Sequence, residues 1–209
     1  MRTLLRRWCY FYKNTHMKIS IILPTLGRSH YAEQLIEQIQ LQKLTGIHEY
    51  QIIHLRWPEW VNWKWNEWAK IAEWEILWFL NDDIVIPVWL CEELLKWLGN
   101  AKISCPYTTI GRDKFCLPMN KKVGNIAGWC FMMRKSDYAP IPDELDLWFG
   151  DDWLYHKMWE SVYYWGICHH YESKTINRPD LKEQIQERIR KDAQNWDIIY
   201  TNNFKYART

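Results

Sequence analysis

The sequence predicts an α/β domain in which helices flank a mostly parallel central sheet, and three observations support this. Apolar segments of strand length alternate with amphipathic helical segments from residue 18 to residue 98, as in proteins built from β-α-β units. Residues 76–80 are apolar throughout, which is typical of a strand covered on both faces. With 48% hydrophobic and 25% charged residues over 209 positions, the chain has an ordinary globular composition and can form one core without disulfides.

The periodicity of apolar residues places the individual elements. We expect strands at residues 18–25, 50–55, 76–80, 127–133 and 167–171. We expect helices at residues 29–44, 60–74, 87–98, 151–162 and 180–191, with Pro87 in the first turn of the third. Asp180 and Glu183 have the spacing of a capping box. Residues 101–125 contain two glycines and several lysines and are expected to form an irregular, mobile loop.

These elements divide the chain into three parts. Residues 1–16 form a basic and aromatic extension, residues 17–176 the main domain, and residues 177–209 a helix and tail that pack on it. The extension lacks the continuous apolar core of a signal peptide, and no segment reaches the length of a membrane span. We therefore expect a cytosolic protein, in the cytosol of a host cell if the gene is viral. The net charge of +2 gives no case for non-specific nucleic-acid binding.

Cysteines and tryptophans are interpreted structurally. The six cysteines show no Cys-x-x-Cys spacing, and Cys91 and Cys130 lie in apolar segments, which favours reduced, buried thiols. The sixteen tryptophans are large enough to fill a core, although indole rings also stack on sugars and bases. Core packing explains most of them.

Three polar clusters interrupt the apolar elements: Asn81-Asp82-Asp83, Asp151-Asp152 and His169-His170. Each has a simple structural explanation when taken alone, as a turn, a helix start favoured by the helix dipole, and ordinary histidines. Together they provide hard oxygen ligands, an imidazole and a spare carboxylate as a base. Metal-assisted chemistry on a phosphate ester needs this combination.

The order of four motifs resembles that of GT-A fold glycosyltransferases, in particular the family 2 type. The motifs are the opening strand with its Pro24-Thr25 turn followed by Gly27-Arg28, the segment from Asn66 to Asp83, the strand from Ala127, and Trp148-Phe149-Gly150-Asp151-Asp152. His170 with Ser173 resembles the late metal-binding histidine of that family. The resemblance covers residues 18 to about 175. It implies a metal-dependent enzyme that transfers a hexose or a related sugar from a nucleotide diphosphate sugar to an acceptor hydroxyl.

The resemblance also implies roles for individual residues. Asp83 and His170 would bind a divalent cation, Mn²⁺ or Mg²⁺, while Asp152 would act as general base and Asp151 would orient the acceptor, with inversion at the anomeric carbon. The implied donor-binding residues are Pro24, Thr25, Arg28, Asn66, Asn81 and Asp82. The implied acceptor-binding residues are Gly128, Trp129, Trp148 and Phe149, of which the aromatic three would stack against a sugar.

Two departures from the family pattern leave the donor open. Asn81 replaces the usual first acid of the metal motif with a neutral ligand, and the second strand ends in His54-Leu55-Arg56 where the family usually offers an acid to the nucleobase. The acceptor is a glycan or another hydroxyl-bearing molecule, and protein, lipid-linked sugar and modified nucleic acid are all open.

Two other functions compete with sugar transfer. A metal-dependent phosphodiesterase or nuclease would arrange the acids and His170 around one or two ions. A non-catalytic carbohydrate-binding protein would use its tryptophans without metal, but that function leaves the acidic clusters unexplained.

Overall fold

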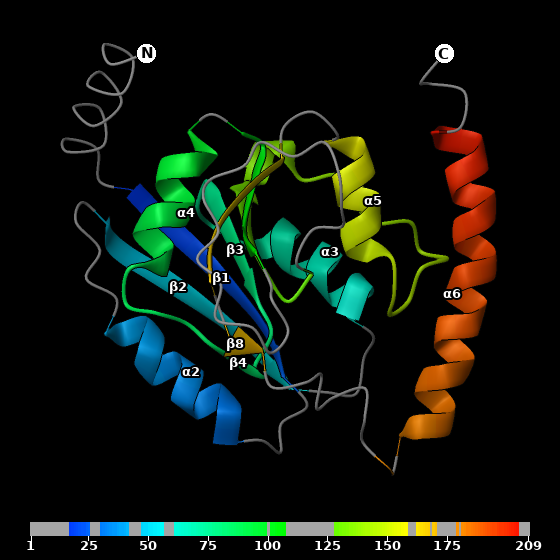
Figure 1. The fold of residues 1–209 in the computed structure, drawn as a ribbon, viewed down its shortest axis with the longest axis horizontal. Coiled ribbons are helices and arrows are strands. Elements are labelled where there is room, and N and C mark those ends of the chain that lie inside the picture. Colours follow the sequence, from blue (N-terminus) through cyan, green and yellow to red (C-terminus); the bar gives the residue numbers. More distant parts are fainter. Residues whose placement is uncertain are drawn as a thin grey trace.

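The computed structural model describes residues 17–25, 30–41, 47–56, 61–99, 101–107, 128–158, 162–167, 169–170, 179 and 181–204. The predictions for the extension at 1–16, for Arg28, for Asp180 and for most of the expected loop at 101–125 lie outside these residues. Within the described residues, helices pack on both faces of a central sheet (Figure 1).

The strands of the central sheet confirm the prediction of a mostly parallel arrangement. In the described part of the chain the sheet has the order β2-β1-β3-β6-β5-β7. The strands are β1 (Met17–Thr25), β2 (Ile47–Arg56), β3 (Ile76–Leu80), β5 (Ile103–Tyr107), β6 (Cys130–Arg134) and β7 (Val162–Ile167). β2, β1 and β3 are parallel, as are β5 and β7. β6 runs antiparallel to both of its neighbours, β3 and β5.

Strand β3 shows why the apolar run at 76–80 is continuous. All five of its residues are buried. Leu77 and Phe79 pack into the core under α3 (Val61–Ile71) and α5 (Gly150–Lys157). Trp78 and Leu80 pack into the core under α2 (His30–Gln40) and α4 (Leu90–Leu98). Because successive side chains point to opposite faces, a strand between two helical layers must be apolar at every position.

Several element boundaries differ from the sequence prediction. Helix α2 ends at Gln40 rather than near residue 44. Helix α4 begins at Leu90, and Pro87 lies just ahead of it, where its carbonyl accepts a hydrogen bond from the Leu90 N–H at 3.0 Å. Helix α5 ends at Lys157, so Val162 belongs to β7 and not to the helix.

Strand β5 was not predicted, because its sequence Ile103-Ser104-Cys105-Pro106-Tyr107 contains a proline and lacks clear alternation. The expectation of a loop throughout 101–125 is therefore wrong for residues 103–107. Ser104 and Cys105 are fully buried there, which places β5 inside the sheet between β6 and β7.

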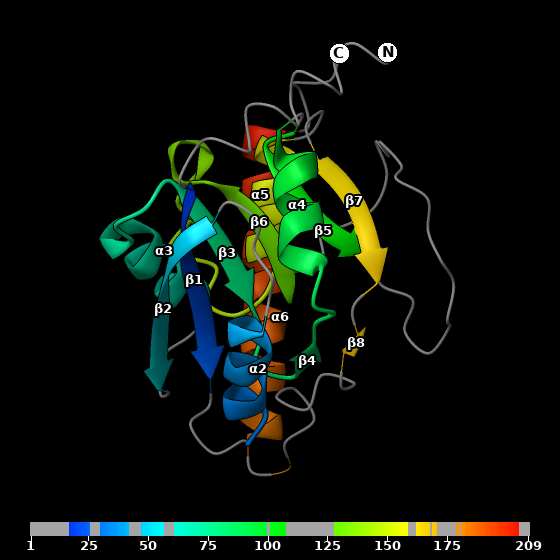
Figure 2. The same cartoon turned by 90° about the vertical axis from the view of Figure 1, so that its left-hand side faces the viewer.

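The C-terminal helix is the longest of the described elements. Helix α6 spans Lys182–Asn203 and begins after Leu181, without a side-chain cap. It lies on the α3 and α5 side of the sheet, away from α2 (Figures 1 and 2). Its aromatic residues Trp196 and Tyr200, with the following Phe204, pack against the core on that side. The predicted C-terminal helix is thus confirmed and extends well beyond residue 191.

Two further predictions can be compared with the structure. Cys91 and Cys130 are buried free thiols, as expected, and burial raises the pKa of Cys91 well above its usual range. Among the described residues, none of the helices combines the length and the hydropathy needed to cross a bilayer.

Candidate active site

The carboxyl ends of β1 and β3 bring Thr25 and Asp82 together. The two strands are parallel neighbours, with Ile22 opposite Phe79, so the residues after them leave the sheet at the same edge. The Thr25 hydroxyl donates a hydrogen bond to Oδ2 of Asp82 at 2.7 Å, and both side chains are buried. Pro24 is half-buried beside them. Asp82 is thus held in a fixed orientation at the edge where open α/β sheets bind ligands.

Asp83 lies where two distant segments meet. Its side chain is only 2% exposed, and it directly precedes β4 (Ile84–Val85). β4 pairs antiparallel with β8 (His169–His170), with Ile84 opposite His170 (Figure 2). The backbone of the predicted metal-binding histidine therefore lies beside the backbone that follows the predicted metal-binding acid. The histidine side chains lie outside the described part of the structure.

Gly128 and Trp129 contact both the turn that follows β3 and the acids that open α5. The backbone N–H of Asn81 donates to the carbonyl of Trp129 at 2.8 Å. On its other side the segment packs against the helix start, because a Cβ placed on Gly128 would lie 2.8 Å from the carboxyl carbon of Asp151. Only glycine allows this close approach. The segment therefore contacts both acidic clusters, which sequence reasoning could not bring together.

Asp151 and Asp152 open α5, as predicted. Burial raises the pKa of Asp151 to about 7, and the neighbouring Asp152 carboxylate adds to this, while hydrogen bonds from the backbone act in the opposite direction. Burial also raises the pKa of Asp152. Carboxyl groups whose pKa is raised toward neutrality are suited to accept a proton from a substrate hydroxyl at physiological pH.

The residue before α5 has an unusual backbone. Phe149 has φ of 61° and ψ of 7°, and it is the non-glycine residue with positive φ in the described part of the chain. This left-handed conformation is unfavourable by about 1–3 kcal/mol for a residue with a side chain, and such strain concentrates at functional sites. Its ring stacks on Trp196 of α6, with centroids 5.5 Å apart and an interplanar angle of 5°. The contact with α6 helps to hold Phe149 in this conformation.

Asn62 on α3 supports the same segment and was missed by sequence reasoning. It is 1% exposed, and its side-chain amide donates to the carbonyls of Leu145 at 3.1 Å and Trp148 at 2.9 Å. Gly150 packs closely over its amide group. The sequence signal was its position three residues before Trp65, which places a polar residue on the buried face of the helix.

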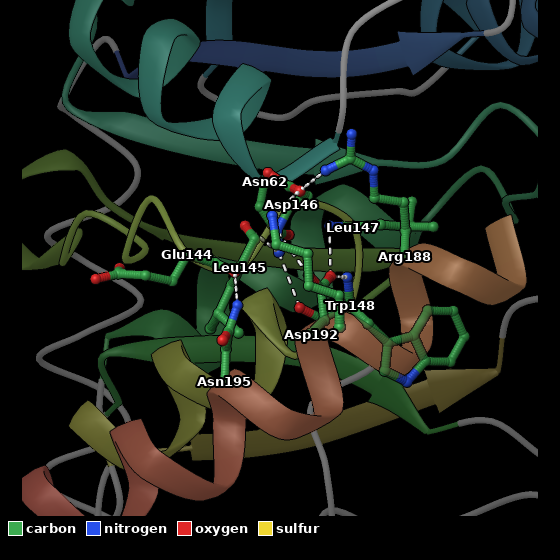
Figure 3. Close-up of polar contacts among 10 residues, drawn as sticks. Asn62, Glu144, Leu145, Asp146, Leu147, Trp148, Arg188, Asp192 and Asn195 are labelled. Atoms are coloured by element: carbon green, nitrogen blue, oxygen red, sulfur yellow. Dashed lines mark hydrogen bonds and ion pairs between the residues drawn. The ribbon is translucent and has the colours of Figure 1, made fainter. Parts of the chain in front are cut away.

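Asp192 on α6 supports the segment from the opposite side and was also missed. Its carboxylate is completely buried and accepts three backbone hydrogen bonds, from Asp146 at 3.1 Å, Leu147 at 2.8 Å and Trp148 at 2.7 Å (Figure 3). The signal was again positional, because Asp192 follows the buried Ile185 by seven residues, or two helical turns.

Three predicted ligand residues have informative surroundings. The side chain of Asn66 accepts hydrogen bonds from the Tyr138 hydroxyl at 2.9 Å and the Ile141 N–H at 2.8 Å, and it donates to the Ile141 carbonyl at 2.8 Å. The Asn66 amide thus uses these hydrogen bonds to hold the segment at residues 138–141, and not to bind a nucleotide sugar. Trp148, in contrast, is 37% exposed, and Trp129 is half-buried, so both retain ring surface for a ligand.

The residues that follow β3 are suited to a divalent cation that is coordinated by both the protein and a substrate phosphate. Among the described residues, no group of three or more His, Cys, Asp or Glu could hold a metal ion. Mg²⁺ and similar ions are commonly bound by one or two carboxylates together with substrate phosphates and water. The buried carboxylate of Asp83, next to the β8 backbone, is consistent with a site of this kind.

Comparison with known proteins gives no match in sequence. No protein-family model matches the chain, and no curated protein matches it.

Comparison of the folds does find matches. TarS 1–349 of S. aureus has a TM-score of 0.52 and 11% identity, over 92% of this chain and 76% of that one. Glucosyl-3-phosphoglycerate synthase from Mycobacterium tuberculosis, in complex with Mn²⁺, UDP-glucose and phosphoglyceric acid, has a TM-score of 0.58 and 12% identity, over 87% and 80%. A mannosyltransferase from Pyrobaculum calidifontis, in complex with GDP-Man and Mn²⁺, has a TM-score of 0.55 and 11% identity, over 79% and 62%. These likenesses confirm the predicted GT-A fold.

Proposed function

We propose that this protein is a metal-dependent glycosyltransferase that moves a sugar from a nucleotide diphosphate sugar to an acceptor hydroxyl, with inversion. The observation that carries this proposal is the Gly128–Trp129 segment. It contacts Asn81, which leads into the strand-end acids, and Asp151, which opens α5. The segment therefore connects the residue two positions before the buried Asp83 with the pair of carboxyl groups that opens α5. Two structures of the same fold contain a nucleotide sugar with Mn²⁺.

The turn after β3 forms the donor half of the proposed site. Asp83 and His170 would hold Mn²⁺ or Mg²⁺, with the donor diphosphate and water as the remaining ligands. When bound, the cation would neutralise the negative charge that develops on the diphosphate leaving group. Asp82, fixed by the hydrogen bond from Thr25, would lie beside the donor, and Pro24 and Arg28 would bind the nucleotide.

The start of α5 forms the acceptor half. Asp152 accepts the proton of the acceptor hydroxyl while that oxygen forms a bond to the anomeric carbon of the donor sugar. The bond between this carbon and the diphosphate oxygen breaks, and its electron pair leaves with the nucleoside diphosphate. Attack on the face opposite the leaving group inverts the anomeric configuration. Asp151 orients the hydroxyl, and Trp129, Trp148 and Phe149 provide stacking surfaces for the acceptor or the transferred sugar.

A thermal-shift screen tests this function. The purified protein is heated with common nucleotide sugars, including UDP-glucose and GDP-mannose, in the presence and absence of Mn²⁺. A ligand that binds only the folded state raises its stability, by about 2.7 kcal/mol at a hundred times Kd. We expect at least one donor to raise Tm when Mn²⁺ is present and to do so much less without it.

The outcomes separate the competing functions. Sugar transfer would be contradicted if no donor stabilised the protein and the protein hydrolysed none of them. Cleavage of a nucleic acid that is lost in Asp83→Ala would favour a nuclease instead. Sugar binding that needs no metal and survives Asp152→Asn would favour a carbohydrate-binding protein.

A further inference from the structure

We propose that Asp192, on the C-terminal helix α6, is a positioning residue that sets the orientation of the acceptor half of the site. This inference rests on the proposed glycosyltransferase function. Asp192 is distant in sequence from the acids of α5, but it binds the segment that leads directly into them (Figure 3).

The hydrogen bonds to Asp192 require a carboxylate at this position. Asp192 is 0% exposed, and its two oxygens together accept the N–H groups of three consecutive residues, 146 to 148. A carboxylate that accepts several backbone N–H groups is held strongly, because charge-assisted hydrogen bonds are about twice as strong as neutral ones. Three consecutive N–H groups aimed at one carboxylate fix the path of the backbone there.

This path determines where the acids of α5 lie. Trp148 is followed by Phe149 in its left-handed conformation and then by the first turn of α5. No flexible linker separates the clamped N–H of Trp148 from Asp151 and Asp152. The Trp153 N–H in turn donates to the Phe149 carbonyl at 2.9 Å, which continues the hydrogen-bonded chain into the helix. A shift at residues 146–148 therefore moves both carboxyl groups.

The contacts between Asp192 and the backbone of residues 146–148 form a clamp, and three other residues of α6 strengthen it. Arg188 forms an ion pair with Asp146, and Lys191 approaches the same carboxylate at 3.2 Å. The Asn195 amide donates to the Glu144 carbonyl at 2.7 Å. These partners are more exposed than Asp192, so we expect each to contribute less. Together they show that one face of α6 is devoted to the 144–148 segment.

A positioning role predicts a particular kinetic effect. The donor half of the site is built from β1, β3, β4 and β8, and none of the hydrogen bonds or ion pairs described for Asp192 reaches these strands. Loss of the clamp should therefore lower the turnover number and leave donor affinity unchanged. Misplacement of a reacting group by about 1 Å can slow a reaction by about a hundredfold.

The test compares Asp192→Asn with the wild-type protein. The substitution keeps the size of the side chain but replaces one accepting oxygen with an amide that cannot accept the same N–H groups. The probe is the nucleotide sugar that stabilises the wild-type protein with Mn²⁺, with water as acceptor and release of nucleoside diphosphate as readout. We expect kcat to fall about 10- to 100-fold and donor Kd, measured by titration, to change less than about twofold. Glu187→Gln, at an exposed position of the same helix, should match the wild type.

A second variant keeps the test decisive if Asp192→Asn does not fold. Arg188→Met combined with Asn195→Ala removes the outer anchors and retains the buried carboxylate, and we expect kcat to fall about 3- to 10-fold at unchanged donor Kd. Wild-type kcat in the folded variants would overturn the positioning role and leave the glycosyltransferase function intact. A loss of donor affinity equal to the loss of turnover would also overturn it. A wild-type protein that neither binds nor hydrolyses any donor would overturn both proposals.

Discussion

The two acidic pairs of this protein, Asp82-Asp83 and Asp151-Asp152, have similar sequences and different surroundings. Asp82 and Asp83 follow a central strand and are both buried, and Asp82 accepts a hydrogen bond from the neighbouring strand. Asp151 and Asp152 begin a short helix and have raised pKa values. Trp148, which precedes Asp151 by three residues, is held by contacts from α3 and α6, far away in the sequence.

The difference shows how the element around a pair of acids selects their chemistry. On the proposed function, the rigid strand end holds a carboxylate as a fixed ligand for the cation that also binds the donor diphosphate. At the start of α5, burial raises the pKa of the two carboxyl groups, and this favours proton transfer. Separate roles for the two pairs would give substitutions at each pair different effects on turnover and on donor binding.

Loss of the proposed base should have the largest effect. Asp152→Asn keeps the shape of the side chain and removes its ability to accept the proton. General base catalysis contributes about 10²–10⁴-fold, so we expect turnover of the stabilising donor to fall by that factor. Release of nucleoside diphosphate measures it. Glu144→Gln, at an exposed acid near the same segment, is the control, and equal turnover in Asp152→Asn would place the base elsewhere.

Loss of the proposed metal ligand should remove the effect of the cation. In Asp83→Asn we expect the Mn²⁺-dependent part of the donor-induced Tm increase to disappear, because a neutral amide is a weaker ligand for a hard cation than a carboxylate. For a chain of this size each kcal/mol corresponds to about 2–4 °C in Tm. Thermal melts with donor, with and without Mn²⁺, measure the difference. A shift in Asp83→Asn as large as that of the wild type would contradict the assignment.

The segment between the two acidic pairs should be sensitive to volume. Gly128→Ala introduces a Cβ that would meet the Asp151 carboxyl group, and overpacking of this kind is unfavourable by about 1–3 kcal/mol. We expect lower stability by urea denaturation and lower turnover. Gly99→Ala is the matched control, because Gly99 has an ordinary helical φ of −56°. If both variants behave alike, the close contact between Gly128 and Asp151 does not matter.

The raised pKa of Asp151 predicts a smaller, pH-dependent effect on stability. Its pKa is about 7 in the folded protein and 3.8 as the ordinary value, so between these pH values the folded state holds a proton that the unfolded state has lost. The contribution of Asp151 to stability is therefore full below pH 4 and is lost as the pH rises to about 7. The unfolding free energy of Asp151→Asn minus that of the wild type should therefore be higher at pH 8 than at pH 5, by on the order of 2 kcal/mol. Urea denaturation at the two pH values measures this, and a pH-independent difference would contradict it.

The sequence was sufficient for the features that depend on local pattern. The uniformly apolar segment at β3 revealed a strand covered on both faces, and the position of Asp151 and Asp152 after Gly150 revealed a helix start. In both cases neighbouring residues alone determine the outcome.

Features that depend on tertiary contacts were not accessible in the same way. The reversed direction of β6 is set by its neighbours in the sheet, and the proline in β5 concealed a buried strand. Asp192 shares a helix face with both apolar and polar residues, and only the folded chain shows the three N–H groups from which it accepts hydrogen bonds. Likewise, only the pairing of β4 with β8 brings the backbone of His170 next to the turn that carries Asp83.

The most direct test of separate roles for the two acidic pairs is a calorimetric titration of the Asp152→Asn protein with the stabilising nucleotide sugar. This variant turns the donor over slowly, so its complex persists during the titration. If Asp83 holds the donor through a cation and Asp152 only transfers the proton, the variant should bind the donor with wild-type Kd in Mn²⁺ and lose this binding when EDTA removes the metal. Loss of donor binding in Asp152→Asn, or binding that is equally tight in EDTA, would contradict the division of roles.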